Sequence, residues 1–374
     1  MSKQPKIAIV CDFLTTMGGA ENVVLVMHEA FPDAPIYTAM YNEDKMPAFA
    51  ELDVRPSFLQ KIPRKVRTYY KLFPTLAVKA MRRLDLREFD IILTSSYMHG
   101  HQVRKTRPDQ VIINYCHTPP RYYWSHYNEY RRDPGYGNLN PLIRTLMPLM
   151  VPHQRKLDLQ AVRQVDVFLA NSTETQQRIK KYYNRNSIVI HPPVDINRFT
   201  PAAKRGDHYV TIGRQLPYKR YDLAVTAATK LGKKLIVFGN GPAHSRLVDL
   251  AGPTVEFRTD RFGDASDAEY EKAITTARGF IYPAEEDFGI VSVEALAAGA
   301  PVIGLARGGT TDIVTSPEVG VLFDRQTSIS VAKAIEQAEK RTFDPTVLRR
   351  TAQRFDKTLF LTKLRKVVRD QMIQ

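Results

Sequence analysis

The chain has 374 residues, a length that suggests two or three domains. Hydrophobic residues make up 43% and charged residues 25%, which is typical of globular proteins and excludes a wholly disordered chain. Lysine and arginine outnumber aspartate and glutamate by 54 to 39, and the resulting charge of +15 predicts an anionic partner: nucleic acid, an acidic membrane or a phosphorylated small molecule.

Short β-rich runs alternate with longer helical stretches along the chain. The predicted strands are 6–11, 35–40, 90–96, 111–117, 165–171 and 187–191, followed by 209–213, 234–239, 255–258, 279–282, 301–305 and 320–323. Several are continuous apolar runs, as expected for buried parallel strands. The repetition predicts an α/β protein with two doubly wound, Rossmann-like domains. Ligands of such sheets bind at the carboxyl ends of the strands, so we expect a ligand in a deep cleft between the domains.

The boundary between the domains is expected in the stretch 191–207, which is rich in proline and charge and has little apolar periodicity. We therefore place the first domain at 1–195 and the second at 196–374. The helix expected at the end of the chain can pack back on the first domain.

Residues 55–87 are both basic and aromatic, most clearly at 58–71 and 76–84. This pattern suits a helix that lies on an anionic membrane surface. It suits equally well an ordinary surface helix that packs its apolar side on the core, so both interpretations stay open.

Several signals are missing from the sequence. It contains no apolar run of 18 residues, and 1–6 leads directly into an apolar strand, so we expect no membrane span, signal peptide or transit peptide, and a cytoplasmic protein that can bind the inner face of the cell membrane. The two cysteines, Cys11 and Cys116, are too few for a disulfide framework or a four-cysteine zinc site, and we expect both to be buried. Because no Asp-x-Asp pair occurs, no metal is expected.

The segment 285–303 carries the strongest signal, since it follows a strand, turns at Gly289, and continues as a helix into the next strand. A helix that begins near Gly289 presents free backbone N–H groups, which form an anion site. Glu286 precedes this helix and Glu294 lies about one turn inside it, so their carboxylates can accept hydrogen bonds from hydroxyls of a sugar or ribose. The alternative is that both glutamates merely stabilise the start of a helix.

Further short motifs occur along the chain in a fixed order. Together they are Gly18-Gly19-Ala20-Glu21, His117-Thr118-Pro119, Gly213-Arg214-x4-Lys219, Glu286-x7-Glu294 with Phe288-Gly289 inside it, Ala298-Gly299-x-Pro301-Val302 and Arg307-Gly308-Gly309. In order and spacing they resemble the signature of retaining family-4 glycosyltransferases of the GT-B fold, and the resemblance covers nearly the whole chain. It implies that the first domain binds the acceptor, that the second binds a nucleotide-sugar donor, and that no metal or other cofactor takes part.

The resemblance also implies a role for individual residues. Gly18 and Gly19 lie against the donor phosphates or the reacting sugar, although a tight turn after a strand also explains them. Arg214 and Lys219 clamp the diphosphate and stabilise the charge that develops on it as it leaves. His117, at the end of a strand, contacts the donor sugar and helps to stabilise the transition state.

In the segment 285–303 the resemblance assigns Glu286 to sugar hydroxyls and Glu294 to the ribose. Gly289, Ile290 and Val291 offer backbone N–H groups to the donor sugar or phosphate, and Phe288 is a further donor-binding position. Base selection falls to 255–263, where Arg258 and Arg261 can meet a base edge. The aromatic residues at 122–127 could line an acceptor groove, but core packing explains them equally well.

The sequence most resembles bacterial enzymes of cell-surface polysaccharide synthesis, several of which are GDP-mannose-dependent α-mannosyltransferases. The segment 213–225 supports this group. We therefore expect transfer of mannose from GDP-mannose, with retention of configuration, to a lipid-linked diphosphate or saccharide acceptor. A UDP-sugar donor, a phosphorylase or epimerase of the same fold, and a basic nucleic-acid-binding protein remain alternatives. We expect no nucleic-acid partner, because no recognisable motif accompanies the charge.

Overall fold

The computed structural model describes residues 5–63, 73–132, 134, 137, 140–258 and 264–372. The chain forms two compact units, one made of Met1–His191 together with Phe360–Gln374 and the other of Pro192–Leu359. The first division therefore falls at 191/192, four residues before the expected position at 195/196, and the chain returns to the first unit after completing the second.

The first unit is built on a parallel sheet whose strand order is β3-β2-β1-β4-β5-β6-β7 in the described part of the chain. The strands are β1 (Ile7–Cys11), β2 (Ile36–Thr38), β3 (Val54–Pro56), β4 (Ile91–Ser96), β5 (Val111–Cys116), β6 (Val167–Ala170) and β7 (Ile188–Val189). All except β3 coincide with predicted strands. β3 escaped prediction because this short edge strand contains an arginine and a proline in place of an apolar run.

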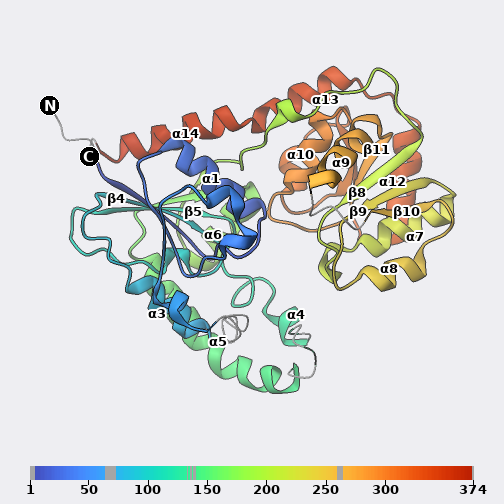
Figure 1. Cartoon of the computed structure of the whole chain (residues 1–374). Coiled ribbons are helices and arrows are strands. Elements are labelled where there is room, and N and C mark those ends of the chain that lie inside the picture. The colour runs from blue at the N-terminus through green and yellow to red at the C-terminus, as the bar shows by residue number, and fades with distance from the viewer. Residues whose placement is uncertain are drawn as a thin grey trace. The chain divides into compact units, whose positions relative to one another are not determined.

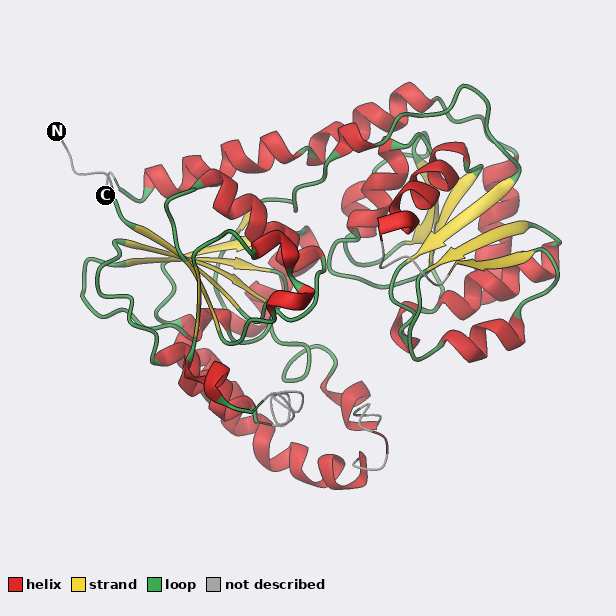
Figure 2. Cartoon of the chain, viewed as in Figure 1, coloured by secondary structure: helices red, strands yellow, loops and turns green. Residues whose placement is uncertain are grey.

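Helices cover both faces of this sheet (Figures 1 and 2). They are α1 (Gly19–Ala30), α3 (Pro74–Arg82), α5 (Asn140–Val162), α6 (Thr173–Tyr183) and α14 (Lys357–Asp370), whereas α4 (Tyr127–Arg132) packs on α5. Successive strand residues point to opposite faces, so that Ile9 packs in the core under α1 and α14, whereas Val10 packs in the core under α3 and α6. Arg365 of α14 donates to backbone carbonyls at the end of α1, and the two helices lie side by side in Figure 1.

The second unit has a parallel sheet of order β10-β9-β8-β11-β12-β13 in the described part of the chain. The strands are β8 (His208–Ile212), β9 (Lys234–Phe238), β10 (Val255–Arg258), β11 (Gly279–Tyr282), β12 (Val302–Leu305) and β13 (Gly320–Phe323). The helices are α7 (Tyr221–Leu231), α8 (His244–Leu250), α9 (Asp264–Thr276), α10 (Ile290–Ala297), α11 (Thr310–Ile313), α12 (Ser328–Glu339) and α13 (Pro345–Ala352). One apolar core lies under α9, α10 and α13, and the other under α7, α8 and α12. Both units are thus doubly wound α/β structures, as predicted.

The basic and aromatic segment 55–87 lies partly outside the described residues, since 64–72 are not among them. In the described part, α3 buries Ala77, Val78, Ala80 and Met81 in the core of the first unit. This is the packing expected of an ordinary surface helix. Among the described helices, none combines the length and the apolarity needed to cross a membrane.

Candidate active site

The centre of the candidate site in the second unit is an ion pair between the first glutamate of the motif and the lysine that follows β8. Lys219 Nζ lies 2.9 Å from Glu286 Oε1, and the two side chains are only 15% and 19% exposed. Burial acts to lower the pKa of the Lys219 ammonium, but the charge of Glu286 outweighs this effect and holds that pKa above its ordinary value. Lys219 therefore carries a full positive charge at neutral pH.

Two phenols complete the surroundings of this carboxylate. Tyr218 donates to Glu286 Oε1 at 3.3 Å, and Tyr282, at the end of β11, donates to Glu286 Oε2. The pKa of the Tyr282 phenol is raised well above its ordinary value by burial and by the charge of Glu286, so it stays protonated and remains a donor. The carboxylate is thus fixed by one cation and two hydroxyl groups, with Lys219 and Glu286 arriving from loops far apart in the sequence.

Glycines bring the backbone close to this cluster at two turns. Gly289 precedes α10 with φ +94°, and a Cβ there would lie 3.2 Å from the Tyr282 hydroxyl and 2.9 Å from Cε1 of that ring. The start of α10 therefore sits against the same phenol that holds Glu286. Gly213, after β8, has φ +145°, and a Cβ there would overlap the Tyr221 hydroxyl and lie 3.2 Å from Lys219 Nζ. Side chains at either turn would distort the site.

Helix α10 supplies both the anion site and the second glutamate of the motif. The first N–H groups of a helix have no acceptor within the helix, so those at Ile290 and Val291 are suited to an anion. Glu294 Oε2 accepts from the buried Tyr270 phenol at 2.9 Å. The Phe288 ring is buried and packs against Phe355, so only its backbone is suited to donor contact.

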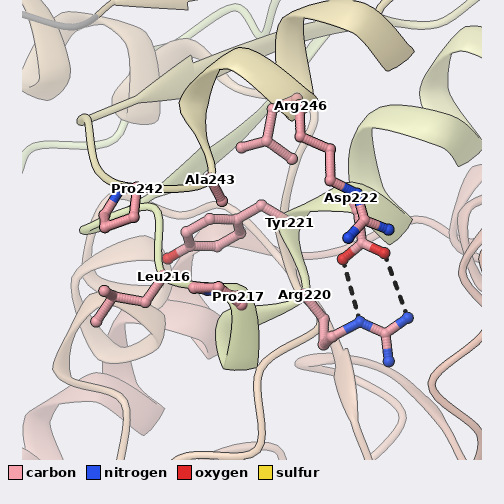
Figure 3. A pocket seen from close by; sticks show the side chains of 9 residues that line it. Leu216, Pro217, Arg220, Tyr221, Asp222, Pro242, Ala243 and Arg246 are labelled. Carbon is pink, nitrogen blue, oxygen red and sulfur yellow. Dashed lines mark hydrogen bonds and ion pairs between the residues drawn. The ribbon is translucent and has the colours of Figure 1, made fainter. Parts of the chain in front are cut away.

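The two arginines that follow β8 differ in their exposure and in their partners. Arg214 is exposed. Arg220 adopts a left-handed conformation with φ 54°, and its guanidinium pairs with Asp222 at 3.1 Å. Figure 3 shows this pair beside the Tyr221 ring at a separate pocket of about 350 Å³ between the loops after β8 and β9. The left-handed conformation at Arg220 thus gives two adjacent cations different partners. Lys219 forms an ion pair with Glu286, and Arg220 forms one with Asp222.

In the first unit the predicted histidine lies just after β5. His117 is 9% exposed, its Nε2 lies 2.8 Å from Ser95 Oγ of β4, and its carbonyl accepts from Thr175. Ser95 lies at the carboxyl end of its strand. His117 and Ser95 are therefore polar groups at the edge of the sheet where parallel α/β sheets bind ligands.

The glycine turn after β1 also lies at this edge. Gly18 caps α1 and Gly19 begins it, but the φ of −165° at Gly18 is ordinary extended backbone. A Cβ at Gly18 would lie 2.9 Å from Glu21 Oε2, so a side chain there would require the Glu21 carboxylate to shift. Burial, followed by the charge of Asp12, raises the pKa of the Glu21 carboxyl to about 7.

Asp12 is a polar residue that the sequence reasoning did not single out. Its carboxylate is 1% exposed and accepts backbone N–H groups from the loop after β4, including those of Tyr97 at 2.7 Å and Gly100 at 2.6 Å. Burial nevertheless raises its pKa. The sequence could have pointed to Asp12, because it is an acidic residue directly after a buried strand. Its carboxylate holds the backbone of residues 97–100, in the loop after β4.

The aromatic residues at 122–127 pack mostly against side chains from other parts of the first unit. Tyr122 stacks on Tyr130 with ring centroids 3.8 Å apart, and Trp124 stacks on Tyr182 at 5.3 Å. The Trp124 indole also donates to the buried Asp158 at 2.7 Å. These contacts favour the packing interpretation over an open acceptor groove.

The segment proposed for base selection is only partly described, because 259–263, including Arg261, lie outside the described residues. Arg258, at the end of β10, pairs with Glu256 at 2.6 Å. Among the side chains that the structure describes, no group of three His, Cys, Asp or Glu residues has the arrangement of a metal site.

Two family models match consecutive parts of the chain. The model for Glycosyltransferase Family 4 matches residues 17–198, and that for Glycosyl transferases group 1 matches residues 194–355. The two matches meet where the compact units divide.

Curated relatives include D-inositol 3-phosphate glycosyltransferases. That of Salinispora arenicola is 30% identical over 44% of this chain and 45% of its own length, and that of Mycobacteroides abscessus is 29% identical over 47% and 45%. The chain thus spans about half the length of the curated relatives it matches.

Solved structures match over almost the whole chain. Anabaena HepE in complex with UDP has a TM-score of 0.68 and 15% identity, covering 97% of this chain and 100% of its own. Sucrose-phosphate synthase from Thermosynechococcus elongatus has a TM-score of 0.70 and 17% identity, with coverage of 99% and 100%. At these identities the matches show the fold, which is GT-B. The whole chain thus has the GT-B fold, and its first unit is similar to Glycosyltransferase Family 4 and its second unit to Glycosyl transferases group 1.

Proposed function

We propose that the protein transfers a hexosyl unit from a nucleotide sugar to a hydroxyl group of an acceptor. The observation that carries the proposal is the partly buried Lys219–Glu286 pair beside the start of α10, where a cation, helix N–H groups and a carboxylate lie together. A diphosphate needs the first two, and a sugar needs the third.

In the proposed mechanism these groups replace a divalent cation. Lys219, Arg214 and the first N–H groups of α10 neutralise the leaving diphosphate, whose negative charge grows as the glycosidic bond breaks. Glu286 and Glu294 orient sugar and ribose hydroxyls. The acceptor attacks the face that the diphosphate leaves, and a leaving phosphate oxygen takes the acceptor's proton, so the anomeric configuration is retained. His117 contributes a polar contact to the donor sugar.

For the donor we propose GDP-mannose, on the resemblance of 213–225 to mannosyltransferases. A UDP-sugar is the second candidate, because Anabaena HepE was solved with UDP and with UDP-glucose. For the acceptor we propose a lipid-linked diphosphate or saccharide of surface-polysaccharide synthesis, which would bring the protein to the inner face of the cell membrane. The charge of +15 supports an anionic acceptor and an anionic surface.

The test is calorimetric titration of the protein with GDP, UDP and ADP without added metal. One nucleotide should bind clearly more tightly than the others and thereby identify the donor. Lys219→Ala should weaken that binding at least about tenfold, since a charge-assisted contact is worth about 1.5–3 kcal/mol. Glu286→Ala should greatly reduce transfer while the thermal transition stays nearly unchanged.

The matched control is Lys234→Ala, which removes another lysine of the second unit that forms an ion pair. Lys234 is the first residue of β9, whereas Lys219 follows the carboxyl end of β8. It should leave nucleotide binding within twofold of the wild type. If a folded protein binds none of the three nucleotides, the proposed function is wrong and the basic surface should be tested with nucleic acid.

A further inference from the structure

A single buried carboxylate holds the loop that follows β4. Asp12 comes directly after β1, and because β1 and β4 are neighbours in the sheet, Asp12 lies beside the start of this loop. Its Oδ2 accepts the first two N–H groups of residues 97–100, at 2.7 and 3.1 Å. Its Oδ1 accepts those of His99 and, at 2.6 Å, of Gly100. Four consecutive backbone donors thus converge on one side chain.

Successive N–H groups that point at one anion form a nest, an arrangement that in other proteins binds phosphate and similar anions. In this chain the anion is the chain's own Asp12, which is 1% exposed. A hydrogen bond to an ionised acceptor is roughly twice as strong as one between neutral groups, and solvent does not compete for it at a buried position. The conformation of residues 97–100 therefore depends on this carboxylate.

The end of β4 and the loop after it supply two neighbours of the His117 ring. Ser95 Oγ lies 2.8 Å from His117 Nε2, and the Tyr97 ring meets the imidazole edge-on, with centroids 6.4 Å apart. Tyr97 is also the first residue whose N–H group Asp12 accepts. A Cβ at Gly100 would lie 2.9 Å from the Ser95 carbonyl oxygen, so the loop packs closely on the strand end that it follows. A change at the nest should therefore reach both contacts of the ring.

We propose that Asp12 is a positioning residue for His117. Its carboxylate fixes residues 97–100, and these fix the orientation of the imidazole ring through Tyr97 and Ser95. Orientation matters at a reacting centre, since a misplacement of about 1 Å can cost on the order of 100-fold in rate. The inference rests on the proposed function, because that function gives His117 its contact with the donor sugar.

The first test removes the carboxylate and then returns it as a free anion. Asp12→Ala should lower kcat for transfer at least about tenfold, because the nest loses its charge-assisted bonds. Formate carries the deleted carboxylate, so it should enter the nest and raise kcat of this variant at least about threefold, whereas chloride at equal ionic strength should not. If formate restores the thermal transition of the variant but leaves its kcat unchanged, Asp12 has a purely structural role and the proposal is wrong.

A second test follows the His117 ring itself by NMR in protein labelled at histidine, where His117→Gln identifies the signal by its loss. Asp12→Asn keeps the size of the side chain but only one acceptor oxygen, so it should shift this signal. Tyr97→Leu changes a partly exposed side chain and should lower kcat without unfolding the protein. An unmoved His117 signal in Asp12→Asn, or an unchanged kcat in Tyr97→Leu, would overturn the proposal.

Asp166→Ala is the matched control. Asp166 also accepts a backbone N–H group, that of Ile112 at 2.8 Å, but it lies near the amino ends of β5 and β6, at the edge of the sheet opposite His117. The variant should keep kcat within about twofold of the wild type, because distant sites act independently. It should also leave the His117 signal in place and show no response of kcat to formate.

Nucleotide titration of the same variants separates this inference from the proposed function. Asp12→Asn should bind the nucleotide nearly as the wild type does, because Lys219 and Glu286 belong to the other unit. A folded wild type that binds no nucleotide would disprove the proposed function, whereas the His117 signal in Asp12→Asn would still decide whether Asp12 positions the ring.

Discussion

Buried tyrosines hold both glutamates of the candidate site. Tyr282 donates to Glu286 and Tyr270 to Glu294, and both tyrosines are fully buried. A carboxylate held by a hydrogen bond from a rigid ring keeps one orientation, which is what a group that must select among sugar hydroxyls needs. We therefore regard Tyr282 as a positioning residue.

We predict that Tyr282→Phe lowers kcat for transfer by about tenfold or more, since a hydrogen bond to a charged group is worth about 1.5–3 kcal/mol. Tyr209→Phe is the control, because it removes a similar bond from a buried phenol to Glu339, on the face under α12. Both variants should lose similar thermal stability, and activity assays should separate them. Equal activity of the two variants would assign Tyr282 a purely structural role.

The Glu21 carboxyl predicts a specific dependence of stability on pH. Its pKa is about 7 in the folded state and 4.5 ordinarily, so the folded protein keeps a proton that the unfolded chain loses as pH rises. Between pH 4.5 and 7 this group lowers the free energy of unfolding by about 3 kcal/mol.

Glu21→Gln should therefore gain about 3 kcal/mol relative to the wild type between pH 4.5 and 7.5, as measured by urea unfolding at a series of pH values. Glu29→Gln, an exposed position on the same helix, controls for the change in charge. A stability difference between Glu21→Gln and the wild type that stays constant with pH would contradict the raised pKa.

At the scale of elements, the sequence predicted every strand with an apolar run and the start of α10 after Gly289. It did not predict β3, whose three residues are held by pairing with β2 and not by their own pattern. The motifs located Lys219 and Glu286, but their ion pair depends on loops brought together by β8 and β11.

Helix α14 provides a prediction at this scale. Leu364 is fully buried in the core of the first unit, whereas Leu359, in the first turn of the same helix, is 43% exposed. Leu364→Ala should lower the free energy of unfolding by about 2–5 kcal/mol. Leu359→Ala should change it by less than about 1 kcal/mol. Similar losses in both variants, measured by urea unfolding, would show that α14 is not part of that core.

At the scale of the whole molecule, the metal-free mechanism that we propose predicts how transfer responds to a chelator. If Lys219, Arg214 and α10 neutralise the diphosphate, transfer should not change by more than about twofold in excess EDTA. Strong inhibition that added Mg²⁺ or Mn²⁺ reverses would contradict the metal-free mechanism. The assay needs only the donor identified by nucleotide titration and a simple sugar acceptor.

The return of the chain to the first unit has a consequence during synthesis. The core of that unit includes Phe360, Leu361, Leu364 and Val368, which are translated after the entire second unit. At roughly 5–20 residues per second, the sheet of residues 7–189 waits on the order of ten to thirty seconds on the ribosome for the second of the two helices that cover this face. A nascent chain that ends before residue 360 should therefore expose an apolar surface of the first unit that a ribosome-associated chaperone can bind.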